Sequence, residues 1–173
     1  MTLRTREAKP EDAADIARIY NEGIAERIAT FETRPRTTDE IAETLRRRAS
    51  RFPTVVVEGD GRIVGWAGAS EYRSRDCYAG VAEFSVYVAR DSRGRGAGRA
   101  AMEALIVACE SRGFWKLVSR VFPENEPSRA LLAALAFREV GVYRRHAKLD
   151  GVWRDVVIVE RLIGAASEAA ATR

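Results

Sequence analysis

The stretch that decides the fold runs from Val86 to Arg99 and reads Val-Tyr-Val-Ala-Arg-Asp-Ser-Arg-Gly-Arg-Gly-Ala-Gly-Arg. A β-rich run comes first, three alternating glycines follow, and apolar residues at helical spacing come next, so the stretch predicts a strand, a loop and a helix. Glycines at such a junction let several backbone N–H groups converge, and the helix N-terminus adds partial positive charge. The stretch therefore predicts a site for a phosphate or pyrophosphate, with an ordinary tight loop as the alternative.

The loop differs from the two commonest phosphate-binding motifs. A Walker loop requires G-x-x-x-x-G-K-[ST], which the chain does not contain. The dinucleotide fingerprint G-x-G-x-x-G requires a glycine where Arg99 stands. Arg93, Arg95 and Arg99 add positive charge around the glycines, and the guanidinium fork suits phosphate. These residues therefore indicate an anion-binding loop of another type.

Hydrophobic periodicity on both sides of this loop predicts the order β-α-α-β-β-β-α-β-α-β-β. The predicted strands are 2–9, 54–58, 62–68, 81–88, 115–122, 137–149 and 152–162. The predicted helices start at residues 10, 39, 98 and 125. Asp-Gly pairs at 60–61 and 150–151 predict hairpin turns between strands. The fold class that follows is α+β, with a mixed, mostly antiparallel central sheet flanked by helices.

The length of 173 residues suits one domain with a single core. No run of about 18 apolar residues occurs, and the first residues run into charge, so we expect neither a spanning helix nor a signal peptide. We therefore expect a cytoplasmic protein without a membrane partner. Residues 1–163 are predicted to form the domain, and the alanine-rich residues 164–173 are predicted to be a frayed tail.

The composition disfavours several functions. Cys77, Cys109 and the single His146 are too few for a disulfide framework or a zinc site, so no metal is expected. No nucleophile-elbow motif accompanies His146, which disfavours a hydrolase. The net charge is +4 and all but three of the 29 basic residues are arginines. We interpret most of them as a solvated surface rather than as a nucleic-acid site, because no aromatics are interleaved with them.

Taken together, these residues resemble the GNAT acetyltransferase superfamily. Arg93 to Gly98 matches its acyl-CoA loop R/Q-x-x-G-x-G/A, and the order of elements agrees from about Leu3 to Leu162. Within the superfamily the chain is similar to phosphinothricin N-acetyltransferases and, more narrowly, to arsinothricin N-acetyltransferases. The segments that carry this similarity are Ile-Tyr-Asn-Glu at 19–22, Thr-Phe-Glu-Thr at 30–33, Glu-Phe-Ser-Val-Tyr-Val at 83–88 and Gly-Val-Trp-Arg-Asp-Val at 151–156.

The resemblance implies acetyl-CoA as the acetyl donor. In the family, the strand that matches Val86 to Val88 contacts the pantetheine arm through its backbone, and the glycine loop holds the pyrophosphate. Asn125 matches a position that contacts the cosubstrate, with a plain helix N-cap as the alternative. The residues expected to bind acetyl-CoA are Val86, Tyr87, Val88, Arg93, Gly94, Arg95, Gly96, Ala97, Gly98, Arg99 and Asn125.

Glu83 is the candidate general base. Transfer of an acetyl group from a thioester to an amine requires a neutral amine and a stabilised oxyanion. Glu83 aligns with the glutamate of the family, and it can take the ammonium proton directly or through water. A backbone N–H near Val86 or Tyr87 is expected to polarise the acetyl carbonyl. The alternative is an exposed strand glutamate, which the apolar residues around Glu83 disfavour.

The chain departs from the family pattern at three positions. Leu132 stands where many members carry a tyrosine acid, so we expect the thiolate to leave unaided or to be protonated by water or another group. Asp150 stands where the family has a histidine, and Ala136 replaces the usual glycine of an L-G-F motif. A mechanism that requires that histidine is not carried over, and we interpret the nearby His146 as a solvated strand residue.

The expected acceptor site comprises Phe31, Arg73 and Arg75. Phe31 is expected to supply an apolar wall, and either arginine can pair with the carboxylate or the phosphinate or arsinate group of a glutamate-like amino acid. An exposed basic loop is the alternative for the arginines. Tyr20 and Tyr78 are weaker candidates, which we interpret as aromatics at the edge of the core.

The resemblance thus implies an acetyl-CoA-dependent N-acetyltransferase. Its expected substrate is the α-amine of arsinothricin, phosphinothricin or methionine sulfoximine, attacked directly in a ternary complex, because no motif places an acyl-carrying cysteine or serine. One alternative is an acetyltransferase for a protein N-terminus or a polyamine. Another is a CoA-binding or nucleic-acid-binding module without catalysis. The family tendency also implies a homodimer.

Overall fold

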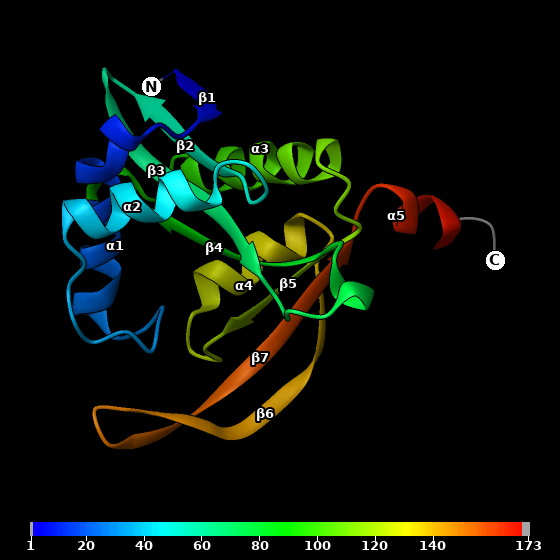
Figure 1. The fold of residues 1–173 in the computed structure, drawn as a ribbon. Helices are drawn as coiled ribbons and strands as arrows, with labels where there is room; N and C mark the ends of the chain where they lie inside the picture. The colour runs from blue at the N-terminus through cyan, green and yellow to red at the C-terminus, as the bar shows by residue number, and fades with distance from the viewer. Residues whose placement is uncertain (1, 171–173) are drawn as a thin grey trace.

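The computed structural model describes residues 2–170, which form one seven-stranded sheet with helices packed against it (Figure 1). The strands are β1 (Leu3–Glu7), β2 (Thr54–Gly59), β3 (Arg62–Glu71), β4 (Val81–Val88), β5 (Lys116–Val121), β6 (Arg138–Leu149) and β7 (Val152–Leu162). The helices are α1 (Ala13–Glu26), α2 (Thr38–Arg48), α3 (Ala97–Ser111), α4 (Glu126–Ala134) and α5 (Ala165–Ala170). Three short 3-10 helices, η1 (Pro10–Asp12), η2 (Asp76–Tyr78) and η3 (Arg90–Ser92), join them. The predicted fold class and element order are confirmed, and the strand order is β1-β2-β3-β4-β5-β7-β6.

Two layers of helices cover the two faces of the sheet. On one face, Ile16 of α1 and Leu45 of α2 pack in a cluster with Val56 of β2. On the other face, Leu105 of α3 packs in the main core with Val55 of β2. Neighbouring residues of a strand point to opposite faces, so the two layers explain the continuous valine run of β2.

The two Asp-Gly turns confirm the predicted hairpins. Asp60 and Gly61 have φ values of 50° and 78°, and Asp150 and Gly151 have values of 49° and 79°. A two-residue turn with positive φ at both positions is type I′, whose twist matches that of the strands it joins. The first turn joins β2 to β3, and the second joins β6 to β7.

The parallel contact between β4 and β5 creates the opening in the sheet. It is the only parallel pairing among the described strands, and it covers just three positions, from Val81 with Lys116 to Glu83 with Val118. β4 continues to Val88 along β3, while β5 continues along β7. The Ser119 hydroxyl donates a hydrogen bond of 2.9 Å to the carbonyl oxygen of Phe84, immediately beyond the last paired position. From there the two strands diverge.

The β6–β7 hairpin extends away from the rest of the fold (Figure 1). Its inner side contributes Leu149 and Val156 to a small core with Phe122. Several large apolar side chains of the hairpin are exposed, among them Val142, Tyr143, Val152 and Trp153. The hairpin therefore presents an apolar surface that the rest of the chain does not cover.

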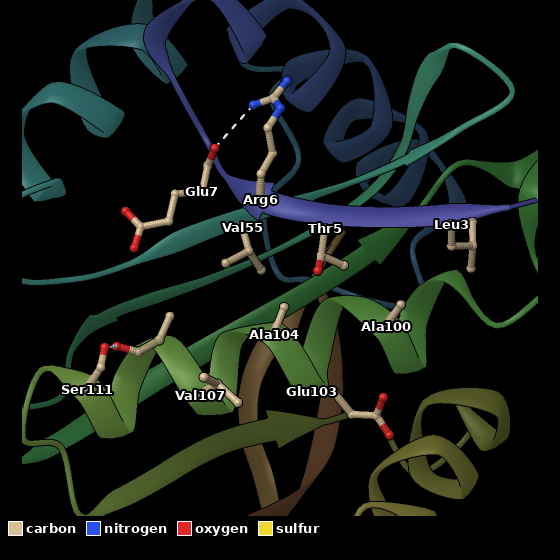
Figure 2. A pocket seen from close by; sticks show the side chains of 11 residues that line it. Leu3, Thr5, Arg6, Glu7, Val55, Ala100, Glu103, Ala104, Val107 and Ser111 are labelled. Atoms are coloured by element: carbon tan, nitrogen blue, oxygen red, sulfur yellow. Dashed lines mark hydrogen bonds between the residues drawn. The ribbon is translucent and has the colours of Figure 1, made fainter.

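A shallow groove of about 640 Å³ lies between β1 and α3, on the side of the sheet that ends in β1 (Figure 2). Its apolar lining includes Leu3, Ala104 and the exposed Val107. Arg6 also lines it but pairs with Asp12 at 2.7 Å and with Glu58 at 2.7 Å. The groove carries none of the residues expected in the active site.

The C-terminal segment contains helix α5 over Ala165–Ala170, within the tail predicted for residues 164–173. Alanine has the highest intrinsic helix propensity, which favours a helix in this alanine-rich segment. Residues 171–173 lie outside the described residues. No helix within residues 2–170 has the length and apolar character needed to cross a membrane.

Ala136 occupies a position that favours glycine. Its φ is 59°, and two hydrogen bonds, from Ala136 N–H to Ala133 O and from Phe137 N–H to Leu132 O, close the end of α4 in a Schellman motif. An alanine in this left-handed conformation costs about 1–2 kcal/mol. Glycine avoids this cost but loses more conformational entropy on folding, which offsets part of the gain.

We therefore expect Ala136→Gly to stabilise the protein by about 1 kcal/mol and to raise its Tm by about 2–4 °C. Thermal unfolding followed by circular dichroism measures the change. Ala133→Gly, at an exposed helical position of α4, is the matched control and should lower the Tm. A lower Tm for both variants would contradict the assignment of strain to Ala136.

Candidate active site

A cleft of about 440 Å³ opens where β4 leaves β5. Its walls come from the end of β4, the glycine loop, the start of α3, the start of α4 and the C-terminal end of α1. The structure brings ten of the eleven residues expected to bind acetyl-CoA to this cleft: Val86, Tyr87, Val88, Arg93, Gly94, Gly96, Ala97, Gly98, Arg99 and Asn125. The eleventh, Arg95, does not line it, and its side chain is exposed.

The edge of β4 supplies backbone groups to the cleft. Successive residues of an antiparallel strand direct their N–H and C=O groups to alternate sides. The carbonyl oxygen of Phe84 accepts from Ser119, on the side away from β3, so Val86 and Val88 direct their groups to that side too. Arg93 Nε donates to the carbonyl oxygen of Val88 at 3.3 Å. An extended ligand with amide groups can therefore bind along Val86 as an added strand.

The glycine loop gives the cleft its anion-binding character. Gly94 and Gly96 have φ values of 72° and 87°, which other residues rarely adopt. Gly96 is the N-cap of α3, and no side chain caps this end of the helix. The first N–H groups of α3 therefore meet the cleft at Ala97 and Gly98, where the helix dipole also favours an anion.

Glu26 links the end of α1 to the glycine loop. Its carboxylate accepts hydrogen bonds from Arg93 Nη1 and Nη2 at 3.0 and 2.9 Å, and from Arg90 Nε at 2.9 Å. Burial disfavours the charged carboxylate, but the hydrogen bonds from the two arginines outweigh this cost and lower the pKa of Glu26. The sequence carried no motif that pointed to Glu26, because the contact joins residues far apart in the chain.

The lowered pKa of Glu26 makes its contribution to stability depend on pH. A carboxyl group with a depressed folded-state pKa stabilises the protein above its unfolded-state pKa, and this contribution disappears as the pH falls through the folded-state pKa. We expect Glu26→Gln to cost about 1–2 kcal/mol at neutral pH and nothing at a pH below the folded-state pKa.

Thermal unfolding of both proteins as a function of pH tests this expectation. The gap between the two Tm values should be constant near neutrality and should close in acid. Glu103→Gln is the control, because Glu103 pairs with Arg99 on the exposed side of α3 and should contribute little at any pH. A gap that is equally wide at all pH values would contradict the role of ionised Glu26.

Glu83 lies at the point where the two strands part. It is the last residue of β4 that pairs with β5, and Arg120 Nη2 of β5 donates a hydrogen bond to its carboxylate. Ser85, the next residue on the same face of β4, is exposed, so this face is open to solvent. Glu83 itself does not line the cleft, which begins at Val86, three residues further along the same strand.

The loop between α1 and α2 closes one side of this face. Phe31 packs edge-to-face on Phe122, with ring centroids 4.9 Å apart. Asn125 holds the loop through its Nδ2, which donates to Ile28 O at 3.2 Å, while its Oδ1 accepts from Ser128 N–H at 3.3 Å. Asn125 is therefore the N-cap of α4 and also lines the cleft, and its contact with the cosubstrate stays a prediction.

Arg73 and Arg75 are not brought into the cleft. Both side chains are exposed on the loop before η2, and the Arg73 guanidinium lies over the Tyr72 ring at 5.3 Å from its centroid. Tyr72 in turn packs edge-to-face on Tyr78 at 5.5 Å. The arginines therefore lie on an exposed basic loop in this structure.

Tyr87 belongs to an aromatic cluster behind the cleft. Its ring stacks on Trp66 at 5.2 Å and packs against Tyr20 at 4.9 Å. A Cβ atom on Gly23 would lie 2.8 Å from the Tyr87 ring, so only glycine lets α1 approach this closely. Burial raises the pKa of Tyr87 and of Tyr20, so both phenols stay neutral and neither is a ready proton donor.

The two cysteines do not form part of the cleft. Cys109 is fully buried in the main core, and burial raises the pKa of its thiol to about 12, whereas Cys77 is exposed on η2. A neutral buried thiol is a poor nucleophile. Within residues 2–170, no three His, Cys, Asp or Glu side chains form a group that could hold a metal ion.

The departures from the family pattern have structural explanations. Leu132 is buried in the main core, and Ser128 and Leu131 are the residues of α4 that face the cleft with Pro127. Asp150 accepts a hydrogen bond of 2.8 Å from Arg27 Nε and so ties the tip of the β6–β7 hairpin to the end of α1. His146 is exposed beside Tyr143, at 5.2 Å between ring centroids.

Comparisons with known proteins agree with this geometry. Residues 16–137 match the model of the acetyltransferase (GNAT) family. The chain is 33% identical over 162 residues to a phosphinothricin N-acetyltransferase of Alcaligenes faecalis, covering 92% of this chain and 82% of that protein. It is 26% identical over 162 residues to an L-methionine sulfoximine/L-methionine sulfone acetyltransferase of Pseudomonas aeruginosa, covering 92% and 94% of the two chains.

A solved structure shares the fold over nearly the whole chain. It is a GNAT superfamily phosphinothricin acetyltransferase from Sinorhizobium meliloti in complex with AcCoA, with a TM-score of 0.89 and 29% identity. The match covers 97% of this chain and 92% of that one. The chain described here belongs to the GNAT acetyltransferase family.

Proposed function

We propose that this protein transfers the acetyl group of acetyl-CoA to the α-amino group of a small glutamate-like amino acid, such as arsinothricin, phosphinothricin or methionine sulfoximine. One observation carries the proposal: the carboxylate of Glu83, at the last position where β4 pairs with β5, stands on the same strand just before the edge at Val86, which lines the cleft together with the glycine loop. This arrangement provides a donor site and a proton acceptor side by side. The phosphinothricin and methionine sulfoximine acetyltransferases similar to this chain support the substrate class.

The residues of the cleft fit acetyl-CoA. The backbone groups of Val86 suit the amides of a pantetheine arm, and the N–H groups around Gly96 and Ala97 suit a pyrophosphate. Arg93 and Arg99 line the same end and add positive charge. Bound there, acetyl-CoA supplies the activated acyl group.

In the proposed reaction, Glu83 accepts the proton that an ammonium substrate must lose before it attacks. The amine nitrogen then forms a bond to the acetyl carbon, the carbon–sulfur bond breaks, and the thiolate leaves with the electron pair while the nitrogen releases its second proton to water. A backbone N–H of the Val86 region stabilises the oxyanion. No tyrosine of α4 faces the cleft, so we propose that the thiolate takes its proton from water, and Glu83 returns its proton to solvent.

Acetylation removes the ammonium charge through which such an analogue resembles glutamate. We therefore propose resistance to the toxin, in the cytoplasm, as the consequence of the reaction.

We also propose a homodimer, since a second copy would cover the exposed Val142, Tyr143 and Trp153 of the β6–β7 hairpin. Analytical ultracentrifugation of the chain and of a Tyr143→Glu variant tests the dimer.

Release of free thiol from acetyl-CoA tests the proposed function. The acceptors are phosphinothricin, arsinothricin, methionine sulfoximine, glutamate, a polyamine and a peptide with a free N-terminus. Preferential turnover of a glutamate-like analogue supports the proposal. Turnover of only the polyamine or the peptide would contradict the proposed substrate class. CoA binding without turnover of any acceptor would indicate a CoA-binding module without catalysis.

A further inference from the structure

Arg120 carries an inference about how the acceptor is recognised, which rests on the proposed function. Its side chain comes from β5, faces the same side of the sheet as Glu83, and donates a hydrogen bond from Nη2 to the Glu83 carboxylate. This is the one ion pair recorded for either side chain within the described residues, and the two side chains are 42% and 29% exposed. Most of the guanidinium fork therefore points to solvent at the open face of the sheet.

The surroundings of Arg120 place it inside the proposed acceptor site. It pairs across strands with Ile158 of β7, and Phe122, the residue that follows the end of β5, packs against Phe31. Phe31, Phe122 and Ile158 belong to the same apolar cluster. The guanidinium thus lies between the carboxylate of the candidate base and the apolar wall that the loop from α1 to α2 supplies.

The other arginines near this face either contact residues other than Glu83 or lie outside the cleft. Arg154 lies over the Phe122 ring at 5.3 Å and donates to Arg27 O at 3.3 Å, with Glu124 at 3.7 Å. Arg27 is held by Asp150. Arg73 and Arg75 are exposed on their loop, outside the cleft. Arg120 is therefore the arginine best placed to meet a substrate at Glu83.

We propose that the Glu83–Arg120 pair recognises the two charges of an α-amino acid, with Arg120 binding the α-carboxylate while Glu83 receives the α-ammonium. An amino acid carries these opposite charges on one carbon, and the pair presents the complementary charges on neighbouring strands. A guanidinium has five donors in a planar fork, so Arg120 can bind a substrate carboxylate through donors that Glu83 does not use. The pair also satisfies both charges before the substrate arrives.

This arrangement favours an α-amine beside a carboxylate over any other amine. A polyamine has no carboxylate and would place a second positive charge near Arg120, which costs free energy at this partly buried site. The first residue of a protein has a free α-amine, but its α-carboxyl is part of a peptide bond, so Arg120 would find no charge to pair with. Specificity then arises from repulsion of the wrong amine as well as attraction of the right one.

The test compares the best amino-acid acceptor with the amine that corresponds to it after removal of the α-carboxylate. Arg120→Ala should raise the KM for the amino acid by roughly 10-fold or more, a loss typical of a charge-assisted hydrogen bond. The KM for the decarboxylated amine should stay equal or fall, and the KM for acetyl-CoA should not change. Arg120→Lys should restore part of the affinity, because an ammonium keeps the charge but lacks the fork.

Arg129→Ala is the matched control, because Arg129 forms an ion pair of 2.7 Å with Glu139 at similar exposure, between α4 and β6. It should leave the KM for both acceptors unchanged. An equal rise in the KM for the amino acid and for the amine in Arg120→Ala would overturn the inference. A rise in KM confined to the amino acid in Arg73→Ala or Arg75→Ala would overturn it too. If Arg120→Ala does not fold, Arg120→Lys and Arg120→Gln decide by the same comparison.

The failure of this inference and that of the proposed function are distinguishable. If the unchanged protein acetylates no amino acid, the proposed function fails before any variant is made. If it acetylates an amino acid and the variants do not separate the acid from the amine, only the role of Arg120 fails.

Discussion

Replacing Glu83 by glutamine should lower kcat by about 100-fold or more, the contribution typical of a positioned general base. Glutamine keeps the size of the side chain but does not take a proton at neutral pH. Glu83 lies at the last paired position between β4 and β5, whereas the cleft for the donor is lined from Val86 onward. We therefore expect the affinity for acetyl-CoA to stay close to that of the unchanged protein and the loss to fall on the chemical step.

The pH dependence separates this role from a merely structural one. As the pH rises towards the pKa of the substrate ammonium, more of the amine is neutral without help from the protein. The difference in kcat between Glu83→Gln and the unchanged protein should therefore shrink in alkaline solution. Stopped assays of product formation, together with calorimetric titration of CoA, measure both quantities. Glu139→Gln, in the ion pair with Arg129, is the control and should keep its kcat. An unchanged kcat for Glu83→Gln near neutral pH would remove Glu83 from the mechanism.

Local sequence signals were sufficient for the framework of the site. The alternation of residues 81–88 predicted a strand with Glu83 and Tyr87 on one face, and the structure places Phe84 in the main core on the other face. The glycine spacing predicted a loop before a helix, and the positive φ values of Gly94 and Gly96 explain why glycine is required there. These features depend on the conformational preferences of neighbouring residues, which a single sequence displays.

The charge pairs of the site depend on contacts between distant parts of the chain. Arg120 meets Glu83 only because β5 pairs in parallel with β4, and Glu26 meets Arg93 only because α1 packs across the end of β4. Neither contact has a signal in the spacing of residues. The expectation for Arg73 and Arg75 rested instead on their nearness in sequence to β4, and the structure leaves both side chains exposed.

Placing a large side chain at position 98 should close the donor site. Gly98 is the second residue of α3, and its φ lies outside the left-handed region, so its conformation does not require glycine. Glycine costs a helix about 0.5–1 kcal/mol relative to alanine. Clearance explains its presence: a Cβ atom there would lie 3.1 Å from Leu131 Cδ2 and 3.5 Å from Val88 Cγ2. Leu131 and Val88 are opposite walls of the cleft, so the missing side chain keeps the cleft open.

We expect Gly98→Leu to raise the Kd for CoA by roughly 100-fold, which corresponds to about 2.7 kcal/mol. The leucine side chain would project between α4 and β4, into space that the pantetheine arm needs under the proposed function. Calorimetric titration of CoA gives the Kd, and the shift in Tm on adding CoA gives an independent measure, because a ligand that binds only the folded state stabilises it. The variant should show almost no shift.

A graded pair of substitutions separates blocked binding from damaged folding. Gly98→Ala requires Leu131 to move by only a few tenths of an ångström, so it should weaken CoA binding far less than Gly98→Leu and should keep the Tm of the ligand-free protein. Val107→Leu, at an exposed position of α3, should change neither quantity. A Gly98→Leu protein that folds and still binds CoA tightly would show that the donor does not pass between Val88 and Leu131. In that case the cleft beside β4 would not be the donor site.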